Sequence, residues 1–299
     1  MTTQPKRPRL SISFSGGRSS AVMLHLTYAK EIERRPVVVT FANTGAEHPA
    51  TLDFVRDVET HWNIPIVWIE AEINPVRGEG TRAHVVRYEN ASRAGEPFEA
   101  AVAKHGVFNR MFPACTRELK TRPILSYLRD VIGWKSRSYS QALGIRADEI
   151  DRVNIDKLES GEIIYPLVEA GYTKEMVGAY MKRQPFDLGI PGDHYGNCVT
   201  CWKKSERKLF TIAQNDPSHF DLFARLERQY GHIRHDNRNA SDSGSITFFR
   251  GNRSAADIVR EAHTLKFERY SDTRQLSMWD LMLDIGGGCG DSCEIDTDE

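Results

Sequence analysis

Short apolar segments alternate with helical patterns near the start of this 299-residue chain. The segments are rich in β-branched residues and span 10–14, 37–42 and 64–69. One helix is predicted to run to about Glu33, and a second to begin near His48 with Leu52, Val55 and Val58 on its apolar face. Such repetition implies right-handed crossovers, so we predict a doubly wound, mostly parallel α/β sheet. Ligands of such sheets bind beyond the carboxyl ends of the strands.

The first predicted strand ends in a Ser-Gly-Gly turn that opens the first helix. A helix start has unpaired backbone N–H groups and partial positive charge, so it attracts an anion such as phosphate. Gly16 and Gly17 allow close approach of the backbone and a positive φ, which a Cβ would obstruct. We predict a phosphate-binding loop made of Ser15, Gly16, Gly17, Arg18, Ser19 and Ser20. The alternative is a strand-to-helix turn capped by serines.

Two other segments place polar residues and glycines at the same edge. They are Asn43, Thr44 and Gly45 after the second strand, and Gly144 and Arg146 at the end of a strand predicted over 138–145. Since the carboxyl ends of parallel strands share one edge, we expect these residues near the ligand. Arg146 has the alternative of pairing only with Asp148 or Glu149.

Residues 72–112 lose the alternating pattern. We interpret them as an excursion over the ligand edge with a short helical piece near 98–104. Its arginines either hold phosphates or solvate a surface loop, and they are Arg77, Arg82, Arg87, Arg93 and Arg110. A helix to about Val131 follows, with Cys115 at its start.

Composition and missing motifs exclude several classes. With 40% hydrophobic and 27% charged residues, the chain is not generally disordered. It has neither a dinucleotide Gly-x-Gly-x-x-Gly fingerprint nor a Gly-x-x-x-x-Gly-Lys-Ser/Thr loop. No apolar run approaches the ~18 residues of a spanning helix, so we expect a cytoplasmic protein without membrane association. A formal net charge of -1 means that nucleic-acid binding would need a local basic patch.

The chain has five cysteines, which in a cytosolic protein suggest metal or redox chemistry. Cys198 and Cys201 form a Cys-x2-Cys turn, and Cys115 is the candidate third ligand. Three cysteines suit a [4Fe–4S] cluster with one open iron, whereas His194 as fourth ligand would make a zinc site. The alternatives are unligated, partly buried thiols or a redox-active dithiol. We predict Cys115, Cys198 and Cys201 as catalytic and metal-binding residues.

The last part of the chain has a different pattern. We divide the chain into a nucleotide-binding domain, 1–215, and a mainly helical extension, 216–299. A helix is predicted from Asp216 to about Tyr230. Arginines and aromatic residues interleave over 225–253, as in a nucleic-acid grip or a solvated surface. A flexible Gly-rich tail carries Cys289 and Cys293.

Four motifs occur in a fixed order: Ser-Phe-Ser-Gly-Gly-Arg-Ser-Ser, Ala-Asn-Thr-Gly-Ala-Glu-His, Cys-Thr-Arg-Glu-Leu-Lys and Gly-Ile-Arg-Ala-Asp-Glu. Over about residues 8–215 this order resembles the phosphoadenosine phosphosulfate (PAPS) reductase family of the PP-loop, or N-type, ATP pyrophosphatase superfamily. The resemblance implies a Rossmann-like sheet that binds ATP or PAPS, with the serine-glycine loop around pyrophosphate or sulfate. It also implies that Arg117 and Arg146 contact phosphate or sulfate. Many superfamily members carry Asp where this chain has Ser19, so magnesium is an expectation from the family alone.

Three functions are open at this point. In the first, an acceptor attacks the α-phosphate of ATP, pyrophosphate leaves, and sulfur carried by the three cysteines, as persulfide or on a cluster, displaces AMP. Its partners would be a sulfur donor and a nucleic-acid acceptor. In the second, Cys289 or Cys293 attacks the sulfur of PAPS or its unphosphorylated analogue, and a dithiol protein completes the release of sulfite. The assimilatory reductase motif Glu-Cys-Gly-Leu-His is matched here only by Cys289 and Gly290. The third is a nucleotide-binding regulator without turnover. The sequence does not indicate an oligomeric state.

Overall fold

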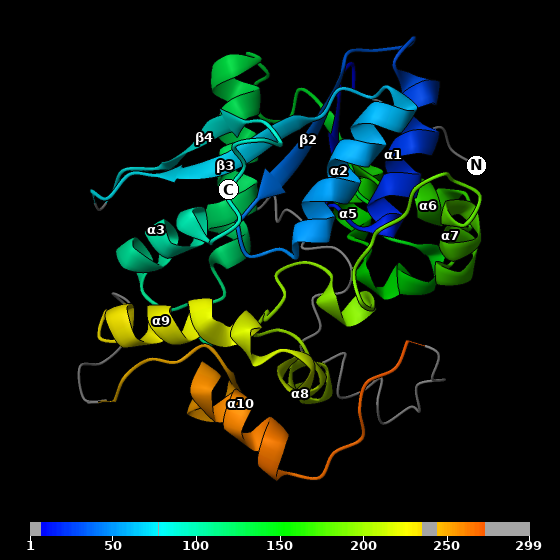
Figure 1. Ribbon diagram of the computed structural model, residues 1–299. Helices are drawn as coiled ribbons and strands as arrows, with labels where there is room; N and C mark the ends of the chain where they lie inside the picture. Colours follow the sequence, from blue (N-terminus) through cyan, green and yellow to red (C-terminus); the bar gives the residue numbers. More distant parts are fainter. Residues whose placement is uncertain (1–6, 77, 235–243, 273–299) are drawn as a thin grey trace.

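The computed structural model describes residues 7–76, 78–234 and 244–272. Within these residues six strands form one sheet in the order β4-β3-β2-β1-β5-β6 (Figure 1). All neighbouring strands pair in parallel except β3 and β4, which are antiparallel. The strands are β1 (Leu10–Ser13), β2 (Val37–Asn43), β3 (Val67–Ile73), β4 (Thr81–Val86), β5 (Ser140–Ala142) and β6 (Ile163–Ile164). The predicted doubly wound α/β fold is confirmed.

Helices cover both faces of the sheet and one of its edges. The α-helices are α1 (Arg18–Glu31), α2 (Pro49–Trp62), α3 (Glu96–His105), α4 (Arg122–Ser126), α5 (Ile155–Glu159), α6 (Pro166–Glu169), α7 (Lys174–Met181), α8 (Glu206–Asn215), α9 (Asp221–Tyr230) and α10 (Ala255–Thr264). Shorter π and 3₁₀ turns are η1 (Arg117–Thr121), η2 (Tyr127–Val131), η3 (Ala147–Arg152), η4 (Asp193–Tyr195), η5 (Pro217–Phe220) and η6 (Arg250–Asn252). None of the helices in these described stretches combines the length and apolarity needed to cross a membrane.

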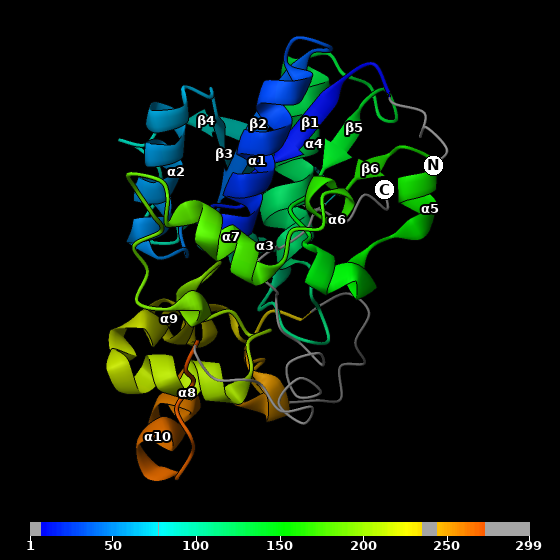
Figure 2. The ribbon, with the colours of Figure 1, turned by 90° about the vertical axis from the view of Figure 1, so that its right-hand side faces the viewer.

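Alternating side chains of the central strands build two apolar layers. Phe41 and Trp68 pack on the side of α1 and α2, whereas Ala42 and Ile69 pack on the side of α4 and η2. Figure 2 shows α1 and α2 in front of the sheet, with α7 beside α1. The second helix begins where it was predicted, because the His48 ring accepts a hydrogen bond from the Ala50 N–H (3.2 Å).

Helices α8, α9 and α10 lie beyond the carboxyl edge of the sheet, and α10 packs against the other two (Figure 1). Phe98 of α3 contacts Phe223 of α9 and Phe248, with ring centroids 5.2 and 6.1 Å apart. The predicted domain boundary at residue 215 falls within this shared apolar core and stays a prediction.

Three sequence predictions need correction. The third strand spans Val67–Ile73 rather than 64–69. The stretch 72–112 is not only an excursion, because its residues Thr81–Val86 form β4 against β3. We missed β4 because an edge strand exposes one face and part of the other: Val85 is 51% exposed. The helix predicted from Asp216 is a 3₁₀ turn followed by α9.

Candidate functional site

A cavity of about 250 Å³ opens where the chain leaves β1 and β5. The sheet extends in opposite directions from this pair of strands, and such a switch point is where ligands bind in doubly wound folds. The cavity is lined by Ser15, Gly16, Gly17, Arg18 and Ser19 of the predicted loop and by Arg146. We call it the phosphate cavity.

The loop has the backbone that the sequence predicts for an anion seat. Gly16 has φ +80°, and a Cβ there would lie 2.6 Å from Thr51 Cγ2. Gly17 is extended at φ −99° and is the N-cap of α1 without a side-chain capping bond. The first turn of α1 has no acidic residue either, so its N–H groups and dipole face the cavity uncompensated by a carboxylate of that turn.

All three serines of the loop have hydrogen-bond partners within the protein. Ser20 Oγ donates to the Gly17 carbonyl (2.9 Å) and accepts from the Ser15 N–H (3.2 Å). Ser19 Oγ accepts from Arg146 Nη1 at 3.0 Å. Gly144 lets the chain after β5 pass close to the start of α1, because a Cβ there would lie 2.9 Å from Ser20 Cα.

Arg146 pairs with the two acids that follow it and also lines the phosphate cavity. Its Nε donates to Asp148 Oδ1 (3.0 Å) and its Nη1 lies 3.4 Å from Glu149 Oε2. The same guanidinium lines the phosphate cavity and is buried. The two carboxylates hold it in one orientation, which prepares it for an anionic ligand.

The charges around the phosphate cavity favour a polyanion. Its cationic side chains are Arg18, Arg146, Lys174 and Lys182, and its acids are Asp187 and Asp193. Arg18 bonds Asp187 at 2.7 Å, and Lys174 bonds Asp193 at 2.6 Å. Burial alone would raise the pKa of Asp193, but the bond from Lys174 and the nearby arginines hold that pKa below its usual value. Asp193 is therefore ionised at neutral pH. The lining has four cations and two acids, and Asp148 and Glu149 pair with Arg146 from outside the lining.

Asn43 and Gly45 do not line this cavity. Asn43 donates to Glu70 Oε1 (2.6 Å) and to the Ser92 carbonyl (2.8 Å). Gly45 has φ +74°, and a Cβ there would lie 2.9 Å from the Gly95 backbone. Both residues contact the 92–95 turn that leads into α3, so their positions indicate that they stabilise this turn.

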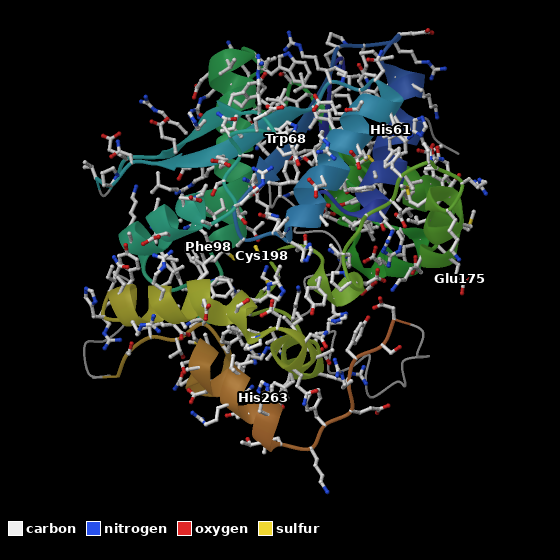
Figure 3. All side chains as sticks on the ribbon, in the orientation of Figure 1. His61, Trp68, Phe98, Glu175, Cys198 and His263 are labelled. Atoms are coloured by element: carbon white, nitrogen blue, oxygen red, sulfur yellow. The ribbon has the colours of Figure 1, made fainter. Side chains whose placement is uncertain are left out.

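Cys115, Cys198 and Cys201 meet at a second, much smaller cavity of about 20 Å³. Thr44, Phe98, Lys120 and Trp202 also line it. Figure 3 shows Cys198 between the sheet and α9, on the side of Phe98. We call this space the cysteine cavity.

Backbone and buried side chains fix the Cys-x2-Cys turn to the strand-β2 motif. Val199 N–H donates to the Ala46 carbonyl (3.0 Å). Cys198 Sγ lies 3.5 Å from Thr44 Oγ1, which bonds Glu47 Oε2 at 2.7 Å. The other Glu47 oxygen lies 3.5 Å from Lys120 Nζ, and both of these side chains are buried. The motifs that contain Glu47 and Lys120 therefore meet beside the thiols.

The phosphate and cysteine cavities are neighbours along one loop. Asn197 lines the phosphate cavity, and Cys198 lines the cysteine cavity. Asn197 has φ +57°, a left-handed conformation that Asn tolerates better than most residues. The loop thus contributes one residue to the wall of each cavity.

A metal site is not assembled among the described residues. They contain no group of three His, Cys, Asp or Glu side chains arranged to hold a metal ion. His194 does not line the cysteine cavity, and burial lowers its pKa to about 4. The zinc site with His194 and the cluster on the three cysteines both stay predictions.

Other predicted residues lie away from the two cavities or outside the described chain. Arg117 lines neither cavity, and its Nε donates to Glu118 at 3.0 Å. The described arginines of residues 72–112 also line neither of these two cavities, and they are Arg82, Arg87, Arg93 and Arg110. Arg77, Cys289 and Cys293 lie outside the described residues.

Sequence reasoning missed part of the phosphate cavity. Lys174, Lys182, Asp187 and Asp193 come from α7 and the loop after it, far along the chain from the serine-glycine turn. No spacing rule links them to that turn. One feature of the sequence could have pointed to Asn197 as a residue of the site, namely its position directly before Cys198.

The chain is similar in sequence to a known domain family and to a phage protein. The model of the phosphoadenosine phosphosulfate reductase domain matches residues 9–152. The uncharacterized nin region protein ORF290 of Escherichia phage lambda is 32% identical over 288 residues, which cover 95% of this chain and 94% of that protein. A structure of the U34-tRNA thiolase NcsA from Methanococcus maripaludis with its [4Fe-4S] cluster aligns with 88% of this chain and 84% of its own, at 13% identity and a TM-score of 0.27. That score is too low to carry an argument about this chain.

Proposed function

The chain belongs to the phosphoadenosine phosphosulfate reductase family, and from this premise we propose that it is a nucleotide-dependent sulfur transferase. It binds ATP in the phosphate cavity, transfers AMP to an acceptor, and replaces the activated oxygen with sulfur carried by the cysteines. The observation that carries the proposal is the step from Asn197 to Cys198, which joins the phosphate cavity to the cysteine cavity.

The adenylation step uses the charges of the phosphate cavity. An acceptor oxygen attacks the α-phosphorus of ATP, the bond to the β-phosphate oxygen breaks, and pyrophosphate leaves. Arg146 and the N–H groups at the start of α1 stabilise the negative charge that develops on the phosphoryl oxygens. Lys174 and Lys182 lie on the same wall and accompany the departing pyrophosphate.

The sulfur step uses all three cysteines. The thiolate of Cys115, the least buried of the three, attacks the terminal sulfane sulfur of a persulfide donor, and the donor leaves as a thiolate. The Cys198 thiolate then takes that terminal sulfur from the Cys115 persulfide, and Cys115 leaves as a thiolate. The terminal sulfur attacks the adenylated carbon, the carbon–oxygen bond breaks, and AMP leaves with the electron pair. The Cys201 thiolate then attacks Cys198 Sγ, which releases the thiolated acceptor and forms a Cys198–Cys201 disulfide. An external dithiol protein supplies the two electrons that reduce it.

The side chains present decide which metal cofactors the two cavities could hold. Cys115, Cys198 and Cys201 are the residues that would hold an iron–sulfur cluster, but they are not arranged as a metal-binding group in the described residues. The proposed sulfur step uses the three thiols, and a cluster on the same residues would supply a binding site for the transferred sulfur. Magnesium remains an expectation from the family, and Asp187 and Asp193, the carboxylates that line the phosphate cavity, would hold it.

Exchange of labelled pyrophosphate into ATP tests the first half-reaction on the full chain. We expect acceptor-dependent exchange that Gly17→Asp abolishes, because a carboxylate there repels the phosphates. The matched control is Gly80→Asp, since Gly80 has open space around it and lies outside the phosphate cavity. Cys198→Ser should keep the exchange and lose thiolated product.

Two results would overturn the proposal. One is the absence of exchange with a panel of RNA, DNA and small acceptors. The other is sulfite release from PAPS, which would support a reductase with a nucleophile in the tail that carries Cys289 and Cys293.

A further inference from the structure

A third cavity, of about 360 Å³, lies between the start of α8, the η6 turn and the segment around Phe267. By the same measure it is larger than the phosphate cavity. Aromatic side chains form much of its wall, with Trp202 and Phe249 both buried. Phe267 is held edge-to-face against Phe210, with ring centroids 5.2 Å apart.

Cations alternate with these rings. The lining carries four cationic side chains, Lys204, Arg207, Arg250 and Arg253, against two acids, Glu206 and Glu268. Arg253 is paired with Glu206 at 2.7 Å and with Glu261 at 2.8 Å. Its charge is therefore balanced locally, and the other cationic side chains of the lining are Lys204, Arg207 and Arg250. Rings beside guanidinium groups suit a flat, electron-rich ring that carries a negative charge nearby.

Trp202 connects this cavity with the cysteine cavity, because it lines both. It is only 7% exposed, and its indole Nε1 has no hydrogen-bond partner among the described residues. An indole N–H is a donor only, and leaving it unpaired when buried is costly. A ligand with an acceptor atom at this point would satisfy it. Any such ligand would also lie one side chain away from the thiols.

We propose that this third cavity binds the acceptor of the reaction, and that the acceptor is a single-stranded nucleic acid with one base inserted against Trp202 and Phe249. This inference rests on the proposed function, whose acceptor it identifies by chemical class. The base stacks on the aromatic walls, and its phosphates meet Arg207 and Arg250. Two more lysines that do not line this cavity, Lys203 and Lys208, lie near the rings of Trp202 and Tyr270, with Nζ 5.6 and 5.0 Å from the ring centroids. Cations outside the cavity as well as inside it favour a phosphate backbone over a single nucleotide.

Fluorescence anisotropy with a labelled single strand of about 12 nucleotides, in RNA and DNA arms, tests the proposal on the full chain without ATP. We expect Arg207→Gln and Arg250→Gln each to weaken binding about tenfold and to lower the salt dependence by about one phosphate contact. Phe267→Ala should weaken binding similarly by removing a stacking wall. The matched control is Arg129→Gln, because Arg129 is exposed, pairs with Asp130, and lies in η2 on the sheet.

The outcomes separate this inference from the proposed function. Binding of either strand with the expected losses supports it, and the preferred arm identifies the sugar. Equal binding by all variants, or displacement by a mononucleotide as effective as by the strand, would overturn it. ATP binding to the phosphate cavity is measured separately by calorimetry. A chain that binds ATP but no strand would refute the nucleic-acid acceptor alone, whereas a chain that binds the strand but no ATP would refute the sulfur-transferase proposal.

Discussion

Asn197 and Cys198 are consecutive residues that line two different cavities. Consecutive Cα atoms are about 3.8 Å apart, so the same short stretch of backbone borders both cavities. The turn is fixed by the Val199 bond to Ala46 and by the Thr44 contact with Cys198. One loop therefore contributes a residue to each of the two cavities.

Replacing Gly16 by Ala should destabilise the protein and weaken ATP binding. The residue would adopt φ +80°, at a cost of about 1–2 kcal/mol, and its Cβ would press on Thr51. Urea unfolding and calorimetric ATP titration measure the two effects. Gly80→Ala is the control, because nothing lies within 4 Å of the added Cβ. Equal stability of the two variants would show that the loop does not need this backbone conformation.

Arg146→Gln should reduce ATP affinity about tenfold or more, because it removes a buried cation from the phosphate cavity. Arg152→Gln is a matched control: Arg152 also pairs with Glu149, at 2.6 Å, but does not line the cavity. Calorimetric titration of both variants with ATP gives the comparison. If both lose the same affinity, the effect belongs to η3 and not to a phosphate contact.

Stability should depend on pH through Glu227. Burial raises the pKa of this carboxyl to about 7, although the N–H groups of Phe248 and Ala255 donate to it. The folded protein therefore holds a proton that the unfolded chain releases near pH 4.5. The stability contributed by Glu227 is complete below that pH and is lost as the pH rises to about 7, by roughly 3 kcal/mol. Urea unfolding from pH 4.5 to 8 should show this decline in the wild type and a flatter profile in Glu227→Gln. Parallel profiles would disprove it.

The buried pair of Glu47 and Lys120 should show strong coupling. Glu47→Gln leaves the Lys120 ammonium buried without its carboxylate and should cost roughly 3 kcal/mol. Lys120→Met added to that variant should recover much of the loss. A double-mutant cycle by urea unfolding measures the coupling, and strict additivity would contradict it.

The sequence predicted the parts of this molecule that depend on local pattern. Strand β1, the serine-glycine loop and the His48 cap were identified because apolar spacing and turn chemistry act over a few residues. The convergence of Cys115 with Cys198 and Cys201 on one cavity followed from the expected fold. Strand β4 was missed because its exposed edge position weakens the apolar alternation.

The remaining errors concern contacts between distant segments. Nothing local marks Lys174 or Asp193 as lining the phosphate cavity, because α7 reaches it only through packing against α1. Asn43 and Gly45 lie after a strand as expected, yet they hold the turn at Ser92 instead of facing the phosphate cavity. Position at the edge of a sheet does not determine which way a side chain points.

The most direct measurement is a crystal structure of the full chain with a non-hydrolysable ATP analogue. We expect the triphosphate on the N–H groups that open α1, with Arg146 in contact with it and Cys198 behind the adjoining loop wall. A nucleotide bound elsewhere, with this seat holding only water, would contradict the account.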